Sequence, residues 1–223
     1  QRVFDELRVK DTGSWNALIG GYIQRGRFKE AFNSFNEMQK HGHSANDVTS
    51  LSILKACGHV RDICKGESIH KQVIMEGLLE NNVLLGAALV DMYAKCGALV
   101  KAKEVFDMLK VRDVITWNTL IVSYAEYGQA ENALHYFDKM HLEGVLPDVV
   151  TFATSLKACS FIGDLNKGYE IHNQLIKTAL LNDLSVCNAL IDMYAKCDSL
   201  MKAQEVFNNL PSRNVVSWNT IIG

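Results

Sequence analysis

The sequence has little proline, no long apolar run and no excess of basic residues. The only prolines in its 223 residues are Pro147 and Pro211. No stretch approaches the roughly 18 uninterrupted apolar residues that a membrane-spanning helix requires. Hydrophobic residues make up 48% of the chain, which is too many for a disordered protein. We therefore expect a folded, soluble chain that does not enter a membrane.

Charge and cysteine spacing exclude further classes. Lys plus Arg total 23 against 25 for Asp plus Glu, a formal net charge of -2, whereas proteins that bind nucleic acid mainly through phosphates are usually basic. The six cysteines include no CxxC pair, so neither a zinc knuckle nor a thioredoxin-like motif is available, and we expect buried free thiols. A protein that reads bases by shape and hydrogen bonding remains compatible with this composition.

A long repeat dominates what the sequence does contain. The segment 87–121, AALVDMYAKCGALVKAKEVFDMLKVRDVITWNTLI, returns at 188–222 as NALIDMYAKCDSLMKAQEVFNNLPSRNVVSWNTII, so the period is about 101 to 102 residues. Within it, a pattern of helix, glycine, helix and turn recurs every 31 to 36 residues. Apolar residues follow helical spacing in both helices. The glycines expected between paired helices are Gly26, Gly97, Gly128 and Gly163.

This pattern predicts an all-α fold. A single hairpin leaves much of its apolar face wet, so stability must come from stacking on neighbouring hairpins. We predict one α-solenoid over 1–223, a right-handed superhelix of stacked antiparallel helix-turn-helix hairpins. Its ends at Gln1 and Gly223 carry no capping helices, and we expect them either to fray or to pair with another molecule, including a second copy.

The strings SWNALI, TWNTLI, SWNTII, DMYAKCG, KACG, KACS, EVFD and GVLPD, with this alternation of unit lengths, resemble the P, L and S motifs of the PLS class of plant organellar pentatricopeptide repeat (PPR) proteins. The resemblance covers essentially the whole chain. Phased on that family, the units are a partial S repeat at 1–11, P at 12–46, L at 47–82, S at 83–113, P at 114–148, L at 149–183, S at 184–214 and a partial P repeat at 215–223.

The resemblance implies that the fifth and last residues of each unit select one RNA base. The pairs are Asn16 with Asn46, Leu51 with Asn82, Ala87 with Asp113, Asn118 with Asp148, Ala153 with Asp183, and Asn188 with Asn214; Asn219 is the fifth residue of the last unit. An amide carries donors and an acceptor, whereas an aspartate only accepts. The family's preferences give 5'-Y-N-N-U-N-C-3', where Y is a pyrimidine and the L units and the pair Ala87 and Asp113 leave their bases undefined.

The resemblance also implies contacts to base faces and phosphates. Packing against base faces contributes a large share of the affinity for single strands. The apolar second residues that would pack on bases are Val48, Leu84, Ile115, Val150 and Val216. Gly13 and Ser185 break this pattern. Lys95 and Lys196, at matching places in the two S units, are expected to meet phosphates.

The function implied is a non-enzymatic scaffold that binds single-stranded RNA in a mitochondrion or chloroplast and needs no cofactor. C-to-U editing is the expected task of the full-length protein, with small organellar editing-factor (MORF-type) proteins at the L repeats, and a catalytic DYW deaminase domain is one expected continuation beyond Gly223. The alternative is a peptide-binding scaffold of the tetratricopeptide kind.

Several residues also have purely structural interpretations. Trp15, Trp117 and Trp218 are expected to fill hairpin cores, as are the repeated tyrosines. His70 and His172 are expected to make packing contacts, since neither has a second ligand at i+3 or i+4. His141 and Glu143 match half of a zinc-deaminase motif but are expected to be a solvated helix end. Capping of helix starts would explain some of the Asn and Asp residues at the fifth and last positions.

Overall fold

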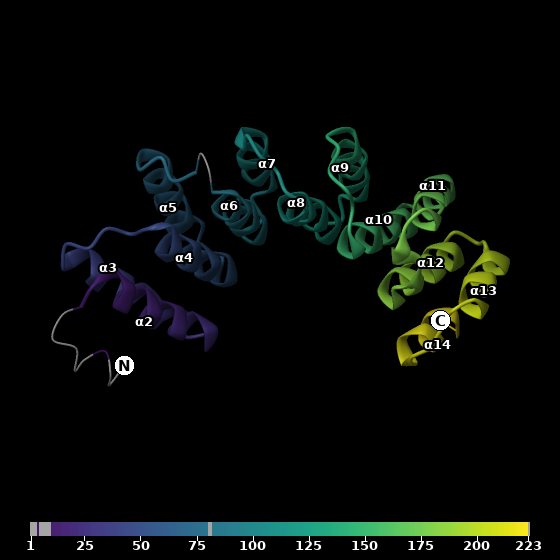
Figure 1. The fold of residues 1–223 in the computed structure, drawn as a ribbon, viewed down its shortest axis with the longest axis horizontal. Helices are drawn as coiled ribbons and strands as arrows, with labels where there is room; N and C mark the ends of the chain where they lie inside the picture. Colours follow the sequence, from purple (N-terminus) through teal and green to yellow (C-terminus); the bar gives the residue numbers. More distant parts are fainter. Residues whose placement is uncertain (1–3, 5–9, 80–81, 223) are drawn as a thin grey trace. The chain divides into compact units, whose positions relative to one another are not determined.

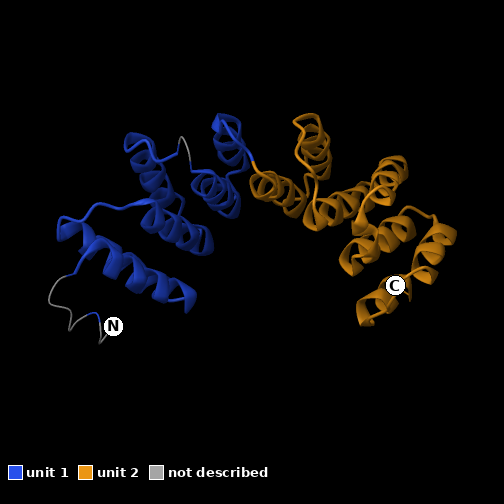
Figure 2. Cartoon of the chain, in the orientation of Figure 1, with its two compact units in different colours: residues 1–112 blue, residues 113–223 orange. Residues whose placement is uncertain are grey.

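The structure, a computed structural model, describes residue 4 and residues 10–79 and 82–222. Most of the S repeat predicted at 1–11 lies outside the described residues. The described chain consists of α-helices and one 3-10 helix, with no strand among these residues. It forms two compact units, residues 1–112 and residues 113–223 (Figure 2).

Unit 1 is a stack of three helical hairpins (Figure 1). The pairs are α2 (Thr12–Gln24) with α3 (Phe28–Lys40), α4 (Asp47–Val60) with α5 (Ile63–Met75), and α6 (Val83–Lys95) with α7 (Leu99–Met108). Each first helix also packs against the next first helix, α2 on α4 and α4 on α6. The first helices therefore form a continuous row within this unit.

Unit 2 repeats this arrangement. Its pairs are α8 (Val114–Glu126) with α9 (Ala130–Leu142), α10 (Val149–Ile162) with α11 (Leu165–Ile176), and α12 (Leu184–Lys196) with α13 (Leu200–Asn208); the 3-10 helix η1 (Ala179–Asn182) precedes α12, and α14 (Val215–Ile222) comes last. Here α8, α10, α12 and α14 form the row of first helices. The predicted all-α stack of hairpins is confirmed.

The core follows the helical periodicity of the sequence. Ile19, Met38, Leu89, Phe106 and Phe137 are among the fully buried side chains, all at positions where the repeat places an apolar residue. Burial of each such side chain is favourable by about 1.5 to 3 kcal/mol. No helix among the described residues is both long and apolar enough to span a membrane.

The tryptophan series agrees with the core prediction in two of three places. Trp15 is 5% exposed and Trp117 is fully buried. Trp218 is 51% exposed, so its predicted burial is wrong. Its ring contacts Phe207 edge-on at a centroid distance of 4.9 Å, but in the described chain no second helix packs over α14 as α9 packs over α8. The missing cover explains the exposure.

Turns between paired helices use the left-handed backbone region. Gly163, the residue after α10, has a φ of +72°. The matching residue after α4 is Arg61, with a φ of +56°. A left-handed conformation costs a residue with a Cβ roughly 1 to 2 kcal/mol, whereas glycine adopts it freely. Arg61 therefore strains the turn that Gly163 makes at no such cost.

We expect Arg61→Gly to raise the free energy of unfolding by about 1 kcal/mol, because it relieves this strain while the helix ends at the same place. Urea denaturation followed by circular dichroism measures the change. Gly163→Ala is the matched control, and it should lower stability by a similar amount. A stability loss in Arg61→Gly would show that the arginine side chain contributes more than its backbone conformation costs.

Candidate functional site

The last residue of every complete unit begins a helix. A side-chain oxygen accepts a hydrogen bond from the backbone N–H two or three residues later in each case, at Asn46, Asn82, Asp113, Asp148, Asp183 and Asn214. Such a cap contributes about 1 kcal/mol. The capping interpretation is thus confirmed for all six last positions. These side chains are held in fixed places whatever else they bind.

The fifth residue of the second P unit contacts the last residue of that unit. Asn118, on α8, donates from Nδ2 to both carboxylate oxygens of Asp148, at 2.9 and 3.0 Å. Its Oδ1 accepts a hydrogen bond from the Thr151 hydroxyl on α10. Two residues that are 30 apart in sequence therefore form one polar cluster, because α8 and α10 are neighbours in the row of first helices.

Charge in this cluster resides on Asp148. Burial pushes the pKa of the Asp148 carboxyl upward, but hydrogen bonds, led by those from the Thr151 backbone and the Asn118 amide, outweigh burial. The pKa of Asp148 consequently lies below its usual value. The carboxylate is ionised at neutral pH, and it can only accept hydrogen bonds.

The first P unit contains the same cluster with an amide in place of the carboxylate. Asn16 Nδ2 donates to Asn46 Oδ1 at 3.1 Å, and the Thr49 hydroxyl donates to Asn16 Oδ1 at 2.6 Å. The sequence pattern did not single out Thr49 and Thr151. The available signal was their place three residues after the capping residue, but that spacing predicts a cap and not a contact with the preceding hairpin.

The second S unit has a more open site. Asn188 lies on α12, and its Oδ1 is buried with no hydrogen-bond partner among the described residues. The residue Asn188 is part of the lining of a concavity of about 860 Å³ along α10, α12 and α14. The lining also includes Asn214, Val216 and Lys196, so four residues predicted from sequence meet here.

The remaining predicted pairs lack such a polar cluster. Leu51 and Ala153 are half-buried apolar fifth residues of the L units, and Asn82 donates weakly to Asp47 at 3.5 Å. Ala87 is 7% exposed. Asn219, on α14, is exposed.

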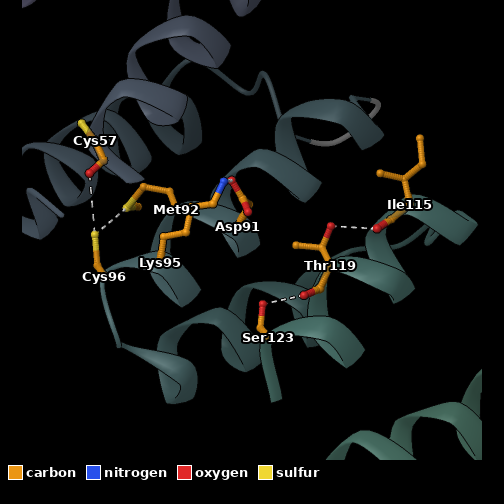
Figure 3. A network of polar contacts seen from close by, with 8 residues as sticks. All are labelled: Cys57, Asp91, Met92, Lys95, Cys96, Ile115, Thr119 and Ser123. Atoms are coloured by element: carbon orange, nitrogen blue, oxygen red, sulfur yellow. Dashed lines mark hydrogen bonds and ion pairs between the residues drawn. The ribbon is translucent and has the colours of Figure 1, made fainter. Parts of the chain in front are cut away.

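The second residues of the units form a set of exposed apolar side chains. Their exposed fractions lie between 47% and 57%, at Val48, Leu84, Ile115, Val150 and Val216. Each of the five is the second residue of a first helix. Ile115 is labelled in Figure 3, where its carbonyl accepts the Thr119 hydroxyl at 2.8 Å. Exposed apolar side chains therefore recur at the second position of five units and are available for contact with a ligand, while Gly13 and Ser185 stand at this position in the other two.

Both predicted phosphate lysines are already in ion pairs. Lys95 contacts Asp91 at 2.7 Å on α6 (Figure 3), and Lys196 contacts Asp192 at 2.9 Å on α12. Both lysine side chains are exposed, and exposed pairs of this kind contribute only about 0 to 1 kcal/mol. They can exchange partners at little cost.

The histidines make local contacts. The ring nitrogen Nδ1 of His70 lies 2.9 Å from the Tyr93 hydroxyl, and that of His172 lies 2.7 Å from Tyr194, which confirms the packing prediction. His141 is exposed at the end of α9. Across residue 4 and residues 10–79 and 82–222, no group of three or more His, Cys, Asp or Glu side chains is placed to hold a metal ion.

Comparisons of sequence identify related proteins. A model described as PPR repeat family matches residues 10–59 and 112–160, and one described as PPR repeat matches residues 88–114 and 185–215. A mitochondrial pentatricopeptide repeat-containing protein of Arabidopsis thaliana is 38% identical over 99% of this chain and 21% of its own length. A chloroplastic one from the same plant is 37% identical over 100% of this chain and 27% of its own length. The chain thus spans well under half of either relative.

Solved structures share the fold. The pentatricopeptide repeat protein PPR10, in a crystal structure with an 18-nucleotide psaJ RNA element, aligns with a TM-score of 0.81 at 24% identity. The match covers 99% of this chain and 33% of PPR10. A crystal structure of PPR10 from maize aligns with a TM-score of 0.71 at 22% identity, over 100% of this chain and 33% of that one.

Proposed function

Because this chain belongs to the pentatricopeptide repeat family, we propose that it binds single-stranded RNA in a sequence-specific manner, one base per repeat. PPR10, whose fold it shares, was crystallised with an RNA element. The observation that carries the proposal is the pair of polar clusters at Asn16 with Asn46 and Asn118 with Asp148. An exposed valine, Val48 or Val150, follows each cluster's last residue by two positions.

The chemistry of these clusters matches base edges. Uracil presents an N3–H donor on its pairing edge, whereas cytosine presents N3 as an acceptor. Asp148 offers only acceptors and so favours uracil, while Asn46 retains amide donors and admits cytosine. Apolar second residues would pack against the base faces, as stacking surfaces do in single-strand binding. The proposed target is 5'-Y-N-N-U-N-C-3'.

The biological setting follows from the relatives. Two that match the whole chain are named mitochondrial and chloroplastic, which supports an organellar location. The PLS arrangement of units favours a role in C-to-U editing, in which this region is a scaffold that positions a transcript. The apolar fifth residues Leu51 and Ala153 suit L units that space the reading units and bind MORF-type editing-factor proteins.

A reciprocal exchange of last residues tests the proposal. Asn and Asp cap helices equally well, so Asp148→Asn and Asn46→Asp change base chemistry without removing a cap. We expect Asp148→Asn to move the preference at the fourth base from U towards C by about tenfold, and Asn46→Asp to move the first base towards U. Fluorescence anisotropy with hexamers that differ at one base measures both.

The wild-type chain with the predicted and a scrambled hexamer is the reference. Equal binding of the two RNAs would overturn the proposed function and leave a peptide-binding scaffold as the alternative. Discrimination by the wild type with no change in either exchange variant would restrict the role of the last residues to capping.

A further inference from the structure

A buried hydroxyl joins the helix cap to the fifth residue in the second P unit. Thr151, fully buried on α10, accepts a hydrogen bond from the backbone N–H of Asp148 at 3.1 Å. Its Oγ1 lies 2.5 Å from Asn118 Oδ1 and 3.0 Å from Asp148 Oδ1. A hydroxyl has a single proton to donate, and the shorter contact directs this proton to Asn118.

This hydroxyl and the Asp148 carboxylate together favour one orientation of the Asn118 amide. In the observed orientation, Oδ1 faces the Thr151 donor and Nδ2 faces the Asp148 carboxylate. A flipped amide would place Oδ1 against the carboxylate, two acceptors with no proton between them. Removal of the Thr151 hydroxyl would eliminate one of the two contacts that oppose the flip.

The first P unit contains the same contacts between a threonine hydroxyl, the fifth residue and the backbone of the last residue. The Thr49 hydroxyl accepts from the Asn46 backbone N–H at 3.3 Å and donates to Asn16 Oδ1 at 2.6 Å. Thr49 is also fully buried. Here the partner of Asn16 Nδ2 is an amide oxygen, so the role of the threonine does not depend on a charged last residue.

In the second S unit, no hydroxyl among the described residues donates to the fifth residue, Asn188. Ser217 stands where the P units are followed by threonine, and its hydroxyl donates to Asn214 Oδ1 at 3.0 Å. The Asn188 Oδ1 therefore stays buried without a partner among the described residues. A serine rotates about χ1 more freely than a β-branched threonine, so nothing directs its proton towards Asn188.

We propose that Thr49 and Thr151 are positioning residues that fix the amide of the base-reading asparagine, Asn16 or Asn118, in each P unit. The inference rests on the proposed function. By this proposal, the third residue of each L unit takes part in recognition of the base that the preceding P unit binds. It also makes the P units more discriminating than the S unit that carries Asn188.

Thr151→Val is the test, because valine keeps the shape of threonine and removes the hydroxyl. We expect the preference for U over C at the fourth base to fall by about 3- to 10-fold, the effect of one hydrogen bond. The preference at the first base should be unchanged, since Thr49 is intact. Thr49→Val should produce the opposite pattern. Thr151→Ser, which keeps the hydroxyl but loses the branched Cβ that orients it, should lose part of the preference, but less than Thr151→Val loses.

Three outcomes decide between explanations. A wild-type chain that does not discriminate between bases would overturn the proposed function and the inference with it. Discrimination by the wild type that is unchanged in Thr151→Val would overturn the inference alone. An equal loss at the first and fourth bases would show a general structural effect, which also overturns it.

A second measurement keeps the inference testable without RNA. In the wild-type chain, the side-chain amide of Asn118 should give well-dispersed, slowly exchanging 15N–1H signals, and Thr151→Val should move them towards the values of a free asparagine. Signals that are the same in both proteins would show that the hydroxyl does not hold the amide.

Discussion

Replacement of Trp117 with alanine should lower the free energy of unfolding by about 3 to 5 kcal/mol, the range for loss of a large buried aromatic side chain. Trp117 is fully buried in the hairpin of α8 and α9. Its ring lies 6.4 Å from that of Tyr136, measured between centroids. Alanine would leave a cavity that the surrounding helices can close only in part.

Trp218 is the matched control for this prediction. It occupies the equivalent place in the repeat and belongs to the same compact unit, but it is 51% exposed. Trp218→Ala should cost about 1 kcal/mol, because only part of the ring leaves an apolar contact. Urea denaturation followed by circular dichroism compares the two variants. Losses of equal size would contradict the distinction drawn from burial.

The tryptophan pair shows what periodicity predicts and what it misses. The similar strings TWNTLI and SWNTII predict the same side-chain direction. The Trp117 ring contacts Tyr136 on α9, and the Trp218 ring contacts Phe207 on α13. Burial depends in addition on a helix that covers the ring, which comes from another segment of the chain. Local pattern therefore predicted the helix and its faces at Trp218 but not the exposure.

Glycine positions were predictable for a simpler reason. Gly26, Gly97, Gly128 and Gly163 all have φ between +70° and +78°, because each turn needs a conformation that glycine adopts at least cost. Arg61 and Asp198 adopt the same region at matching turns. These two turns were not predictable in the same way, because neither arginine nor aspartate signals a left-handed backbone as strongly as glycine does.

The candidate site was predictable only as far as its residues are local. A residue that starts a helix is a capping candidate from its own neighbours, and all six last residues do cap. The contact between Thr151 and Asn118 joins residues that are 33 apart on two helices. It depends on how α8 and α10 pack, which no spacing in the sequence specifies.

Charge adds a constraint on how RNA would be held. Lys95 and Lys196 each face an aspartate one helical turn earlier, and the formal net charge of the chain is -2. Release of counterions therefore supplies little of the binding free energy. Most of the binding free energy must come from contacts with base faces and base edges. Substitution of a residue that contacts a base edge should therefore change specificity more than a change in salt concentration does.

Asn118→Thr is the substitution with the largest expected effect on specificity. Asn118 is 9% exposed and contributes both a donor and an acceptor. Threonine at this position offers a single hydroxyl beside the same Asp148 carboxylate, in place of the amide's donors and acceptor. We expect the preference at the fourth base to move from U towards G by about 1 to 3 kcal/mol, the range for one base-edge contact.

The same variant separates reading from structure. If Asn118 only stabilises the hairpin, its replacement should weaken binding equally to the four hexamers that differ at the fourth base. U would then remain the preferred base. A fifth residue that reads the base changes the order, and only at the fourth position, because Asn16 and Asn188 remain as controls at the first and sixth. Anisotropy titrations with the parent hexamer and the three alternative bases at each of these positions measure all three preferences in one protein. An unchanged order at the fourth base would mean that Asn118 is structural and that its bond to Asp148 is part of the helix cap rather than of a base-reading site.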